Sequence, residues 1–240
     1  LDHAATTPMR PEALEAMLPF YGERFGNPSG SHRVARDARR AIDEARDTVA
    51  ATIGCRASEV VFTGCGTESD STALLGVLAR RPGRPVCSTV EHHAVLHVVE
   101  HSGGRTVGVD GSGRIDLEAL ASVLDESVSI VSVMAVNNEV GAVSPLREIA
   151  AVVRARAPRA VLHTDAIQAP MWMDLRDVME SVDLLSLSAH KFGGPKGAGV
   201  LIVREGTSIE PLLLGGGQEH DRRSGTHNVA GIVAMATALR

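Results

Sequence analysis

One long amphipathic helix is predicted near the start of the chain, between Ser31 and Gly54. Apolar residues recur there every three or four positions, and Ser31 is a good N-cap. The residues expected on its buried face are Val34, Ala38, Ala41, Ile42, Ala45, Val49 and Ile53. Pro11 suits the first turn of an earlier helix, where proline's missing N–H costs nothing. The pattern therefore predicts a helical start, with one face of the long helix packed against the rest of the protein.

Beyond Gly54, short apolar runs alternate with amphipathic segments. The runs predict strands at Val60–Phe62, Val86–Val90, Thr106–Val109, Ile130–Val136, Val161–Thr164, Leu184–Leu187 and Val200–Val203. Helical patterns separate most of them, around Ser69–Ala79, Ala94–His101, Leu117–Leu124 and Leu146–Arg156. Such alternation is typical of a parallel sheet covered by helices on both faces. The sequence therefore predicts an α/β fold with a mainly parallel, seven-stranded sheet flanked by helices.

Composition and charge exclude several classes of partner. The chain has 240 residues, 44% of them apolar, enough for one large domain or a domain and part of another. A net charge of −5 gives no general attraction to nucleic acid or to an anionic membrane, and 2% aromatic residues make base-stacking surfaces improbable. No apolar run reaches transmembrane length, and no signal peptide is recognisable. We therefore expect neither a nucleic-acid partner nor a membrane partner.

The cysteines and the chain ends suggest a compartment and a fragment. Cys55, Cys65 and Cys87 are odd in number and lack metal-ligand spacing, which suits a reducing cytoplasm. The chain starts at Leu1 without Met and stops at Arg240 inside a helical pattern. We interpret it as part of a longer cytoplasmic protein.

Two lysines stand out in a chain whose Lys and Arg residues together number 24. Lys191 and Lys196 both lie in one glycine-rich stretch, and Lys191 closely follows the apolar run 182–187. A lysine of lowered pKa can attack a carbonyl and form a Schiff base, which arginine cannot do, and α/β sheets bind ligands at strand ends. Two surface lysines in a turn are the alternative. The flanking hydroxyl, imidazole and glycines favour Lys191 as a cofactor-bearing lysine.

A second glycine-rich turn, Thr63–Ser69, joins a predicted strand to a predicted helix. Gly66 and Thr67 lie where a backbone can approach a phosphate and where a helix N-terminus offers free N–H groups. The turn matches neither a Walker loop nor a dinucleotide fingerprint. A phosphate cradle and a bare turn without a ligand therefore remain equally open.

Polar side chains also follow three other strands. Asp165, with Gln168 one turn further, could keep a ring nitrogen protonated, as pyridoxal phosphate requires, although Asp also fills helix N-caps. Asn138 follows another strand, where a polar turn is the alternative. His92 could stack on a cofactor ring or could be merely structural. Because these loops converge on one sheet edge, we favour a ligand site there.

A metal site is a weaker hypothesis. His97–His101 matches H-x-x-E-H, a pattern with two histidines one helical turn apart and a glutamate between them. The pattern is short, the region is rich in histidine, and a metal would explain none of the other loops. We therefore predict no metal.

Together these motifs resemble the cysteine desulfurases, pyridoxal-phosphate enzymes of fold type I in the class V aminotransferase superfamily. The resemblance covers essentially the whole chain, and the segments that carry it are Leu1–Pro8, Phe25–Ser29, Ser31-His32, Val136–Gly141 and Arg223–Thr226. The last two are similar to the branch that supplies sulfur for general iron–sulfur cluster assembly, rather than to the selenocysteine-lyase-like branch. Small departures, such as Gly64-Cys65-Gly66 where Ser-Gly-Ala is commoner, change the shape of the phosphate cradle but keep its residues small.

The resemblance implies a role for each candidate residue. Lys191 would bear pyridoxal 5'-phosphate as a Schiff base, Asp165 would pair with the pyridine nitrogen, and His92 would stack on the ring and assist proton transfer. Gln168 and Asn138 would lie beside the phenolic oxygen or the substrate. The phosphate would be held by Gly66, Thr67, Ser188 and His190, and in a homodimer by Thr226 of the other subunit.

The resemblance also implies a domain plan. Residues 1–14 would join a small domain, and residues 15–240 would form the cofactor-binding large domain. Family members continue into a C-terminal small domain that carries a nucleophilic cysteine on a mobile loop and an arginine for the substrate carboxylate. None of the three cysteines here matches that nucleophile, and Cys65 would lie near the phosphate, on the wrong side to attack the substrate sulfur.

The expected activity is therefore conversion of L-cysteine to L-alanine, with the sulfur passed to an enzyme cysteine and then to a sulfur-acceptor or iron–sulfur scaffold protein. Another class V enzyme, a selenocysteine lyase or an aminotransferase, is the alternative. A second alternative is a non-catalytic cofactor-binding fragment, because residues 1–240 alone are not expected to transfer sulfur.

Overall fold

The computed structural model describes residues 2–240, so Leu1 of the Leu1–Pro8 motif lies outside the described residues. The chain begins with helix α1 (Pro11–Met17) and a 3-10 turn, η1 (Leu18–Tyr21). Helix α2 (Arg33–Ile53) confirms the long amphipathic helix. Its N-cap is His32 rather than Ser31, because the His32 ring nitrogen accepts a hydrogen bond from the Ala35 amide. Gly54 caps its C-terminus with a φ of 78°, a left-handed backbone conformation that residues with a side chain rarely adopt.

The seven predicted strands form one sheet, which confirms the predicted fold class. The strands are β1 (Val60–Thr63), β2 (Arg84–Ser88), β3 (Arg105–Val107), β4 (Val128–Ser132), β5 (Val161–Asp165), β6 (Leu184–Ser188) and β7 (Gly199–Val203). Their order is β1-β7-β6-β5-β4-β2-β3. β7 is antiparallel to both of its neighbours, and the other pairs are parallel. The carboxyl ends of β2, β4, β5 and β6 therefore lie at one edge.

Three strands end earlier than their apolar runs predict. β2 stops at Ser88 instead of Val90, β3 at Val107 instead of Val109, and β4 at Ser132 instead of Val136. After β4 the chain still follows β5, since the Val133 amide donates to the His163 carbonyl. It then folds back, with Val136 bridging Val143. After β4 the apolar sequence continues because residues 133–137 are buried, whereas Thr89 after β2 and Gly108 after β3 are exposed.

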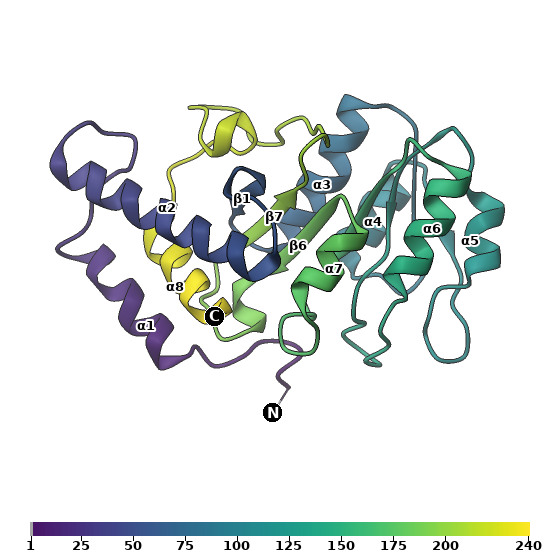
Figure 1. Cartoon of the computed structure of the whole chain (residues 1–240), viewed down its shortest axis with the longest axis horizontal. Helices are drawn as coiled ribbons and strands as arrows, with labels where there is room; N and C mark the ends of the chain where they lie inside the picture. Colours follow the sequence, from purple (N-terminus) through teal and green to yellow (C-terminus); the bar gives the residue numbers. More distant parts are fainter. Residues whose placement is uncertain (1) are drawn as a thin grey trace.

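Helices cover the two faces of the sheet unequally. α3 (Gly66–Arg80) and α4 (His93–His101) bury one face with a small apolar cluster, whereas α2, α5 (Leu117–Val123), α6 (Leu146–Arg156), α7 (Leu175–Ser181) and α8 (Val229–Leu239) contribute to the large cluster on the other. Figure 1 shows α2, α6 and α7 in front of the sheet and α3 behind it. Along β1, Val60 and Phe62 join the large cluster and Val61 the small one, as alternation in a strand requires.

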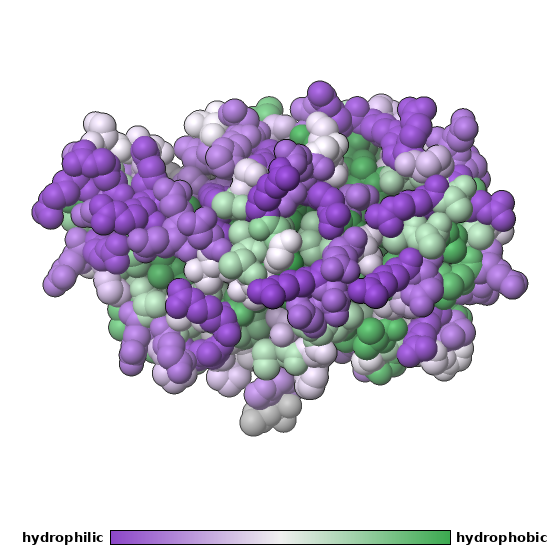
Figure 2. Space-filling model, viewed as in Figure 1, coloured by the Kyte–Doolittle hydropathy of each residue, from purple (hydrophilic) through white to green (hydrophobic). Residues whose placement is uncertain are grey.

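Helix α7 is the element that the pattern did not predict. It is short, and its N-cap Asp174 accepts a hydrogen bond from the Arg176 amide, which is the local signal that marks its start. The outward side of α2 is largely hydrophilic (Figure 2), so this helix buries its apolar stripe and, beside it, Arg46. α8 packs against both α1 and α2, which holds the N-terminal segment on the body of the fold.

Candidate active site

Loops from five strands enclose a cavity of about 230 Å³ at the edge where β5 and β6 end. It is lined by Cys65, Gly66, Thr67, His92, Met134, Val136, Asn138, Asp165, Ile167, Gln168, Ser188, His190 and Lys191. Every candidate residue from the sequence except Thr226 is on this lining. Thr226 is exposed, and it lines a separate shallow pocket with Phe25 and Ala230. The topology therefore brings these distant segments to one place.

The turn between β1 and α3 forms one wall of the cavity. Gly66 is the first residue of α3 and is buried against Ile167 and Ser188, with no room for a side chain: a Cβ there would lie 2.3 Å from Ile167 Cδ1 and 3.2 Å from Ser188 Cβ. Gly199 at the start of β7 lets the Cys65 backbone approach closely, because a Cβ on it would lie 2.8 Å from the Cys65 carbonyl carbon. The wall is thus bare backbone at the N-terminus of a helix, a suitable place for an anion.

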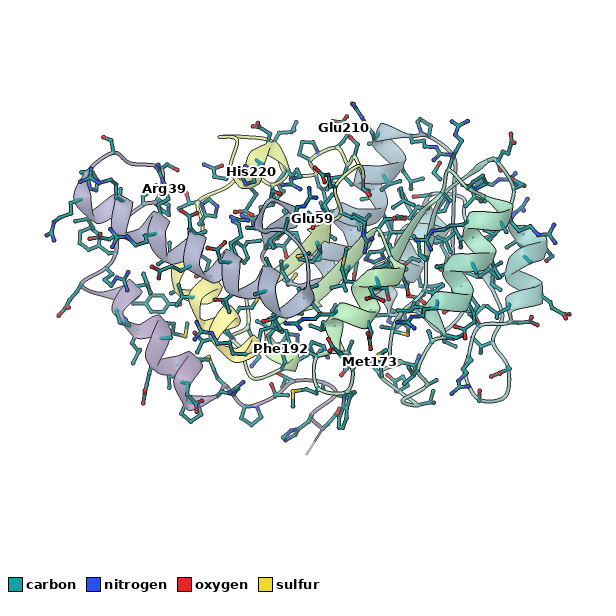
Figure 3. All side chains as sticks on the ribbon, in the orientation of Figure 1. Arg39, Glu59, Met173, Phe192, Glu210 and His220 are labelled. Atoms are coloured by element: carbon teal, nitrogen blue, oxygen red, sulfur yellow. The ribbon has the colours of Figure 1, made fainter. Side chains whose placement is uncertain are left out.

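Lys191 lies in the 3-10 turn η3 (Ala189–Lys191) that directly follows β6. Phe192, labelled in Figure 3, is buried next to it and anchors the turn beside α8. The Lys191 Nζ donates to the Ala4 carbonyl, and burial lowers its pKa, an effect that Asp165 and Asp2 partly oppose. Lys196 is exposed and absent from the cavity lining. Of the two lysines, Lys191 has the environment of a nucleophile.

Asp165 ends β5 and is only 4% exposed. Its Oδ1 accepts a hydrogen bond from the Ile167 amide at 2.9 Å, so the side chain closes a turn rather than capping a helix. Burial raises the pKa of Asp165, while that hydrogen bond and the nearby His92 and Lys191 lower it. Asp165 forms the floor of the cavity. Its carboxylate faces His92 and Lys191 and can neutralise a positive group of a ligand.

His92 has the structural role that the sequence left open, and its ring also lines the cavity. Its Nδ1 accepts a hydrogen bond from the Ala94 amide at 3.1 Å and so caps α4, while the ring lines the cavity. His190 is held by Thr6, whose hydroxyl lies 3.1 Å from the His190 Nδ1. Burial lowers the pKa of His190, and the two neighbouring lysines lower it further. Hydrogen bonds therefore orient both rings, one within the turn that begins α4 and one from the distant N-terminal segment.

Gln168 and Asn138 reach the cavity from loops. The Gln168 amide nitrogen donates to the Ala4 carbonyl at 2.8 Å, the same carbonyl that Lys191 contacts. Asn138 is half-buried and donates to Glu139 Oε1 at 3.0 Å. The neighbouring Asn137 points away and fixes the loop by donating to the Val90 carbonyl at 3.0 Å. The Ala4 carbonyl thus contacts two residues of the cavity lining.

Sequence reasoning missed the apolar part of the lining. Met134, Val136 and Ile167 pack around the polar groups, and each belongs to or follows an apolar run that was interpreted as strand or turn. The signal that could have found them is proximity in sequence to Asn138 and Asp165. Among the cysteines, Cys65 is exposed at the cavity wall, Cys55 is half-buried and Cys87 is buried elsewhere in the sheet.

The H-x-x-E-H pattern lies on α4, outside the cavity lining. Within residues 2–240, no group of three or more His, Cys, Asp or Glu side chains has an arrangement that could hold a metal ion. In the same residues, no helix has the length and apolar character needed to cross a membrane.

The chain matches the sequence model of the aminotransferase class-V family over residues 1–240. It is 44% identical to cysteine desulfurase IscS of Dictyoglomus turgidum over the whole chain, and 45% identical to cysteine desulfurase NifS of Azotobacter vinelandii over 99% of it. The chain covers 62% and 61% of the lengths of these two curated relatives, less than two thirds of each.

Solved structures agree with these relatives. A structure of a NifS-like protein superposes with a TM-score of 0.95 at 39% identity, covering 99% of this chain and 67% of the other. The structure described as SspA in complex with cysteine superposes with a TM-score of 0.93 at 35% identity, covering 99% of this chain and 71% of that one. From this sequence and structural similarity along its entire length, the chain belongs to the aminotransferase class-V family.

Proposed function

We propose that the cavity binds pyridoxal 5'-phosphate, with Lys191 as its covalent attachment point. One observation carries the proposal: a partly buried lysine of lowered pKa and a buried carboxylate, which follow consecutive strands, face the same cavity. Pyridoxal-phosphate enzymes use a lysine for the aldehyde and a partner for the ring nitrogen, and Asp is one such partner. Membership of the aminotransferase class-V family supports the same cofactor.

The residues present fit the phosphate end of this cofactor. Gly66 leaves the helix N-terminus of α3 open, and the hydroxyls of Thr67 and Ser188 and the ring of His190 line the same wall. Backbone N–H groups and hydroxyls are the donors that phosphates use in proteins. We assign the phosphate to these residues. Thr226 would complete the cradle of a second subunit, which makes a homodimer part of the proposal.

The remaining residues would hold the ring and move protons. When bound, the cofactor supplies an electron sink for carbanions at the substrate Cα. Asp165 would hold the ring-nitrogen proton, and His92 would lie against the ring face. Lys191, whose pKa is lowered by burial, would take the proton from Cα as a neutral amine. Gln168 and Asn138 would donate hydrogen bonds to oxygens of the cofactor or substrate.

We further propose that the full-length protein is a cysteine desulfurase for iron–sulfur cluster assembly. The curated relatives carry that enzyme name, and one similar structure holds cysteine. In the reaction, a cysteine thiolate attacks the sulfur of L-cysteine and forms an S–S bond. The C–S electron pair returns to carbon, which is protonated to give L-alanine. The sulfur would then pass to an acceptor protein.

The attacking thiolate is proposed to lie outside residues 2–240. Burial raises the pKa of the Cys55 thiol to about 12 and prevents easy ionisation, and Cys87 is fully buried. Cys65 lies at the wall assigned to the phosphate, away from the position of a substrate sulfur. The greater length of the relatives supports this assignment.

Borohydride reduction tests the cofactor and its lysine together. Protein loaded with pyridoxal phosphate is reduced and digested, and the pyridoxyl mass is located by mass spectrometry. We expect the label on Lys191, with Lys191→Ala losing the label and the absorbance of the bound cofactor, and the matched control Lys196→Ala keeping both. A label on Lys196, or no stoichiometric loading, would overturn the proposed site.

Alanine release tests the substrate. The full-length protein is expected to release alanine from L-cysteine, and the comparison with selenocysteine separates a desulfurase from a selenocysteine lyase. A protein that binds the cofactor but ignores cysteine would refute the activity while leaving the cofactor site intact.

A further inference from the structure

A buried polar layer lies directly behind the floor of the cavity and takes no part in lining it. It consists of Asp70 on α3, Glu91 after β2, Ser132 on β4, His163 on β5 and Ser186 on β6. Each is buried, with Asp70, Ser132, His163 and Ser186 at 0% exposure and Glu91 at 6%. His163 and Asp165 project from the same face of β5, because they are two residues apart. The layer therefore backs onto the Asp165 carboxylate.

His163 occupies the centre of this layer as a neutral ring. Its Nδ1 lies 2.8 Å from the Ser132 hydroxyl and its Nε2 lies 2.9 Å from the Ser186 hydroxyl. Burial lowers the pKa of His163 to about 3. Because this lowered pKa keeps the ring neutral, it offers no positive charge to a neighbouring carboxylate, and hydroxyls lie within hydrogen-bond distance of both ring nitrogens.

Asp70 has no charged partner in this layer. Within residues 2–240, neither of its side-chain oxygens has a hydrogen-bond partner, and Oδ1 lies 3.6 Å from the Nε2 of the neutral His163. Burial raises the pKa of Asp70 well above its usual value, as do the charges of Asp165, Glu91 and Cys65, and only the adjacent Ser186 hydroxyl opposes the rise. A buried carboxylate without partners is among the costliest groups in a protein, and a neutral acid removes most of that cost.

Glu91 has hydrogen-bond partners for one of its two carboxyl oxygens. Its Oε1 accepts hydrogen bonds from the Ser88 hydroxyl and the Met134 amide, both at 2.8 Å, while its Oε2 has no partner in the described part of the chain. Burial raises the pKa of Glu91 to about 8, and the charge of Asp165 adds to the rise. Met134 is itself part of the cavity lining, so Glu91 touches the floor from behind.

Three buried carboxyl groups thus share one small region, and they cannot all be ionised, because like charges at close range in a dry interior repel strongly. Asp165 is the one best placed to keep a negative charge. It accepts the Ile167 amide and faces His92 and Lys191, whereas Asp70 faces a neutral ring.

We propose that Asp70 and Glu91 are held as neutral carboxylic acids behind the floor of the cavity, so that Asp165 alone carries negative charge there. They are positioning residues: they touch no ligand, and they decide where the single charge resides. The inference rests on the proposed function only in naming a cofactor ring nitrogen as the group that faces Asp165. A neutral acid can donate as well as accept, so it also suits the mixed hydroxyl and imidazole surroundings of Asp70.

Infrared difference spectroscopy of the cofactor-free protein tests the protonation directly. At neutral pH, Asp70→Asn and Glu91→Gln are each expected to lose one carbonyl band of a protonated carboxyl group. The matched control is Glu68→Gln, on the same helix as Asp70, because Glu68 pairs with Arg223 at 2.7 Å and should lose a carboxylate band instead. If Asp70→Asn loses a carboxylate band, the proposal is wrong.

Carbon-13 NMR provides the result if the Asp70 variant does not fold. In wild-type protein labelled at the side-chain carboxyl carbons, one Asp signal should stay at its protonated position at neutral pH. A Glu signal should change as the pH passes through about 8, the pKa of Glu91. Aspartate signals that all lie at the ionised position would overturn the inference.

Titrating the absorbance of bound pyridoxal phosphate with pH separates this inference from the proposed function. Asp70→Asn should leave the midpoint unchanged, since it replaces one neutral group with another. Glu91→Gln should lower the midpoint, because above pH 8 it removes a negative charge that favours the protonated cofactor. A shift in Asp70→Asn would contradict a neutral Asp70. Failure to bind the cofactor at all would refute the proposed function and leave the infrared result standing.

Discussion

Among the regions of this protein that bury acidic side chains, those around Glu219 and Asp70 treat them in opposite ways. Glu219, in the 3-10 turn η4 (Glu219–Asp221), is 4% exposed, and its carboxylate accepts hydrogen bonds from Arg46, His227 and the Phe62 amide. These partners lower the pKa of Glu219 to about 2 despite burial. Asp70 is equally buried and has none of them, and its pKa is raised. Burial therefore does not decide the charge of a carboxyl group by itself; the partners that the fold supplies decide it.

The two regions also differ in the strain of their backbone. Glu219, His220 and Asp221 all have positive φ values, of 51°, 56° and 63°, which is rare for residues other than glycine. The bonds to Arg46 and Phe62 offset this strain and hold the segment that leads to Thr226. Figure 3 shows His220 in this segment, on the same side of the molecule as Arg39 of α2. Asp70, by contrast, lies in the regular helix α3 and imposes no backbone strain.

The largest expected effect comes from removing the paired charge. Glu219→Gln leaves Arg46 buried without its counter-ion, and breaking a buried pair in this way costs about 3–5 kcal/mol of unfolding free energy. Urea unfolding at neutral pH measures the loss. The control is Glu210→Gln, which breaks the exposed pair with Arg80. A loss as small as that of the control would show that Arg46 finds another partner, and the contrast drawn above would fail.

A second effect, on the pH dependence of stability, is expected from Glu91. Its pKa is raised from 4.5 to about 8 in the folded protein, so between these pH values the folded state binds more protons than the unfolded state. Wild-type stability should then fall as pH rises, by up to about 1.4 kcal/mol per pH unit from this one group. Glu91→Gln should remove that slope. Unfolding curves measured at pH 5, 6.5 and 8 decide the matter, and parallel stability profiles would refute a protonated Glu91.

The smallest effect is expected where a carboxylate has a partner but no burial. Arg80 and Glu210 lie 2.9 Å apart, but both side chains are about half exposed. Exposed pairs contribute about 0–1 kcal/mol because water screens them and because two long side chains must be ordered. Arg80→Ala and Glu210→Ala, alone and together, should show a coupling energy in that range in a double-mutant cycle. A coupling as large as that of the Arg46–Glu219 pair would mean that burial adds nothing, contrary to the comparison.

The pattern of apolar residues in the sequence was sufficient to predict the strands of the sheet. Its strands were predictable because both faces are covered, so each strand appears as an apolar run, and the ends of β5 and β6 located Asp165 and Lys191. The roles proposed for Gln168 and His190 came from resemblance to a family, since the spacing of these residues alone did not distinguish a ligand from a turn. The helix α7 was missed although Asp174 marks its start, whereas α5, of the same length, was predicted.

The buried polar layer could not have been predicted. Asp70 occurs in the second turn of α3, where an acidic residue ordinarily faces water. His163 lies inside β5, and nothing in the sequence of that strand indicates that serine hydroxyls of the two neighbouring strands lie beside its ring. Their burial follows from the way α3 packs over β5 and β6, and the partners of His163 come from strands 31 and 23 residues away in the sequence.

The sequence by itself determined the elements, the edge of the sheet where the candidate residues gather and the lysine best suited to bear a cofactor, because these depend on local periodicity and on residue chemistry. The tertiary structure alone decided which carboxyl groups are ionised. Glu219 meets Arg46 from 173 positions away, while Asp70 lies beside neutral groups, the His163 ring and the Ser186 hydroxyl. Electrostatic energies depend on distance in space and on the removal of water, and neither quantity is encoded by any short stretch of the chain.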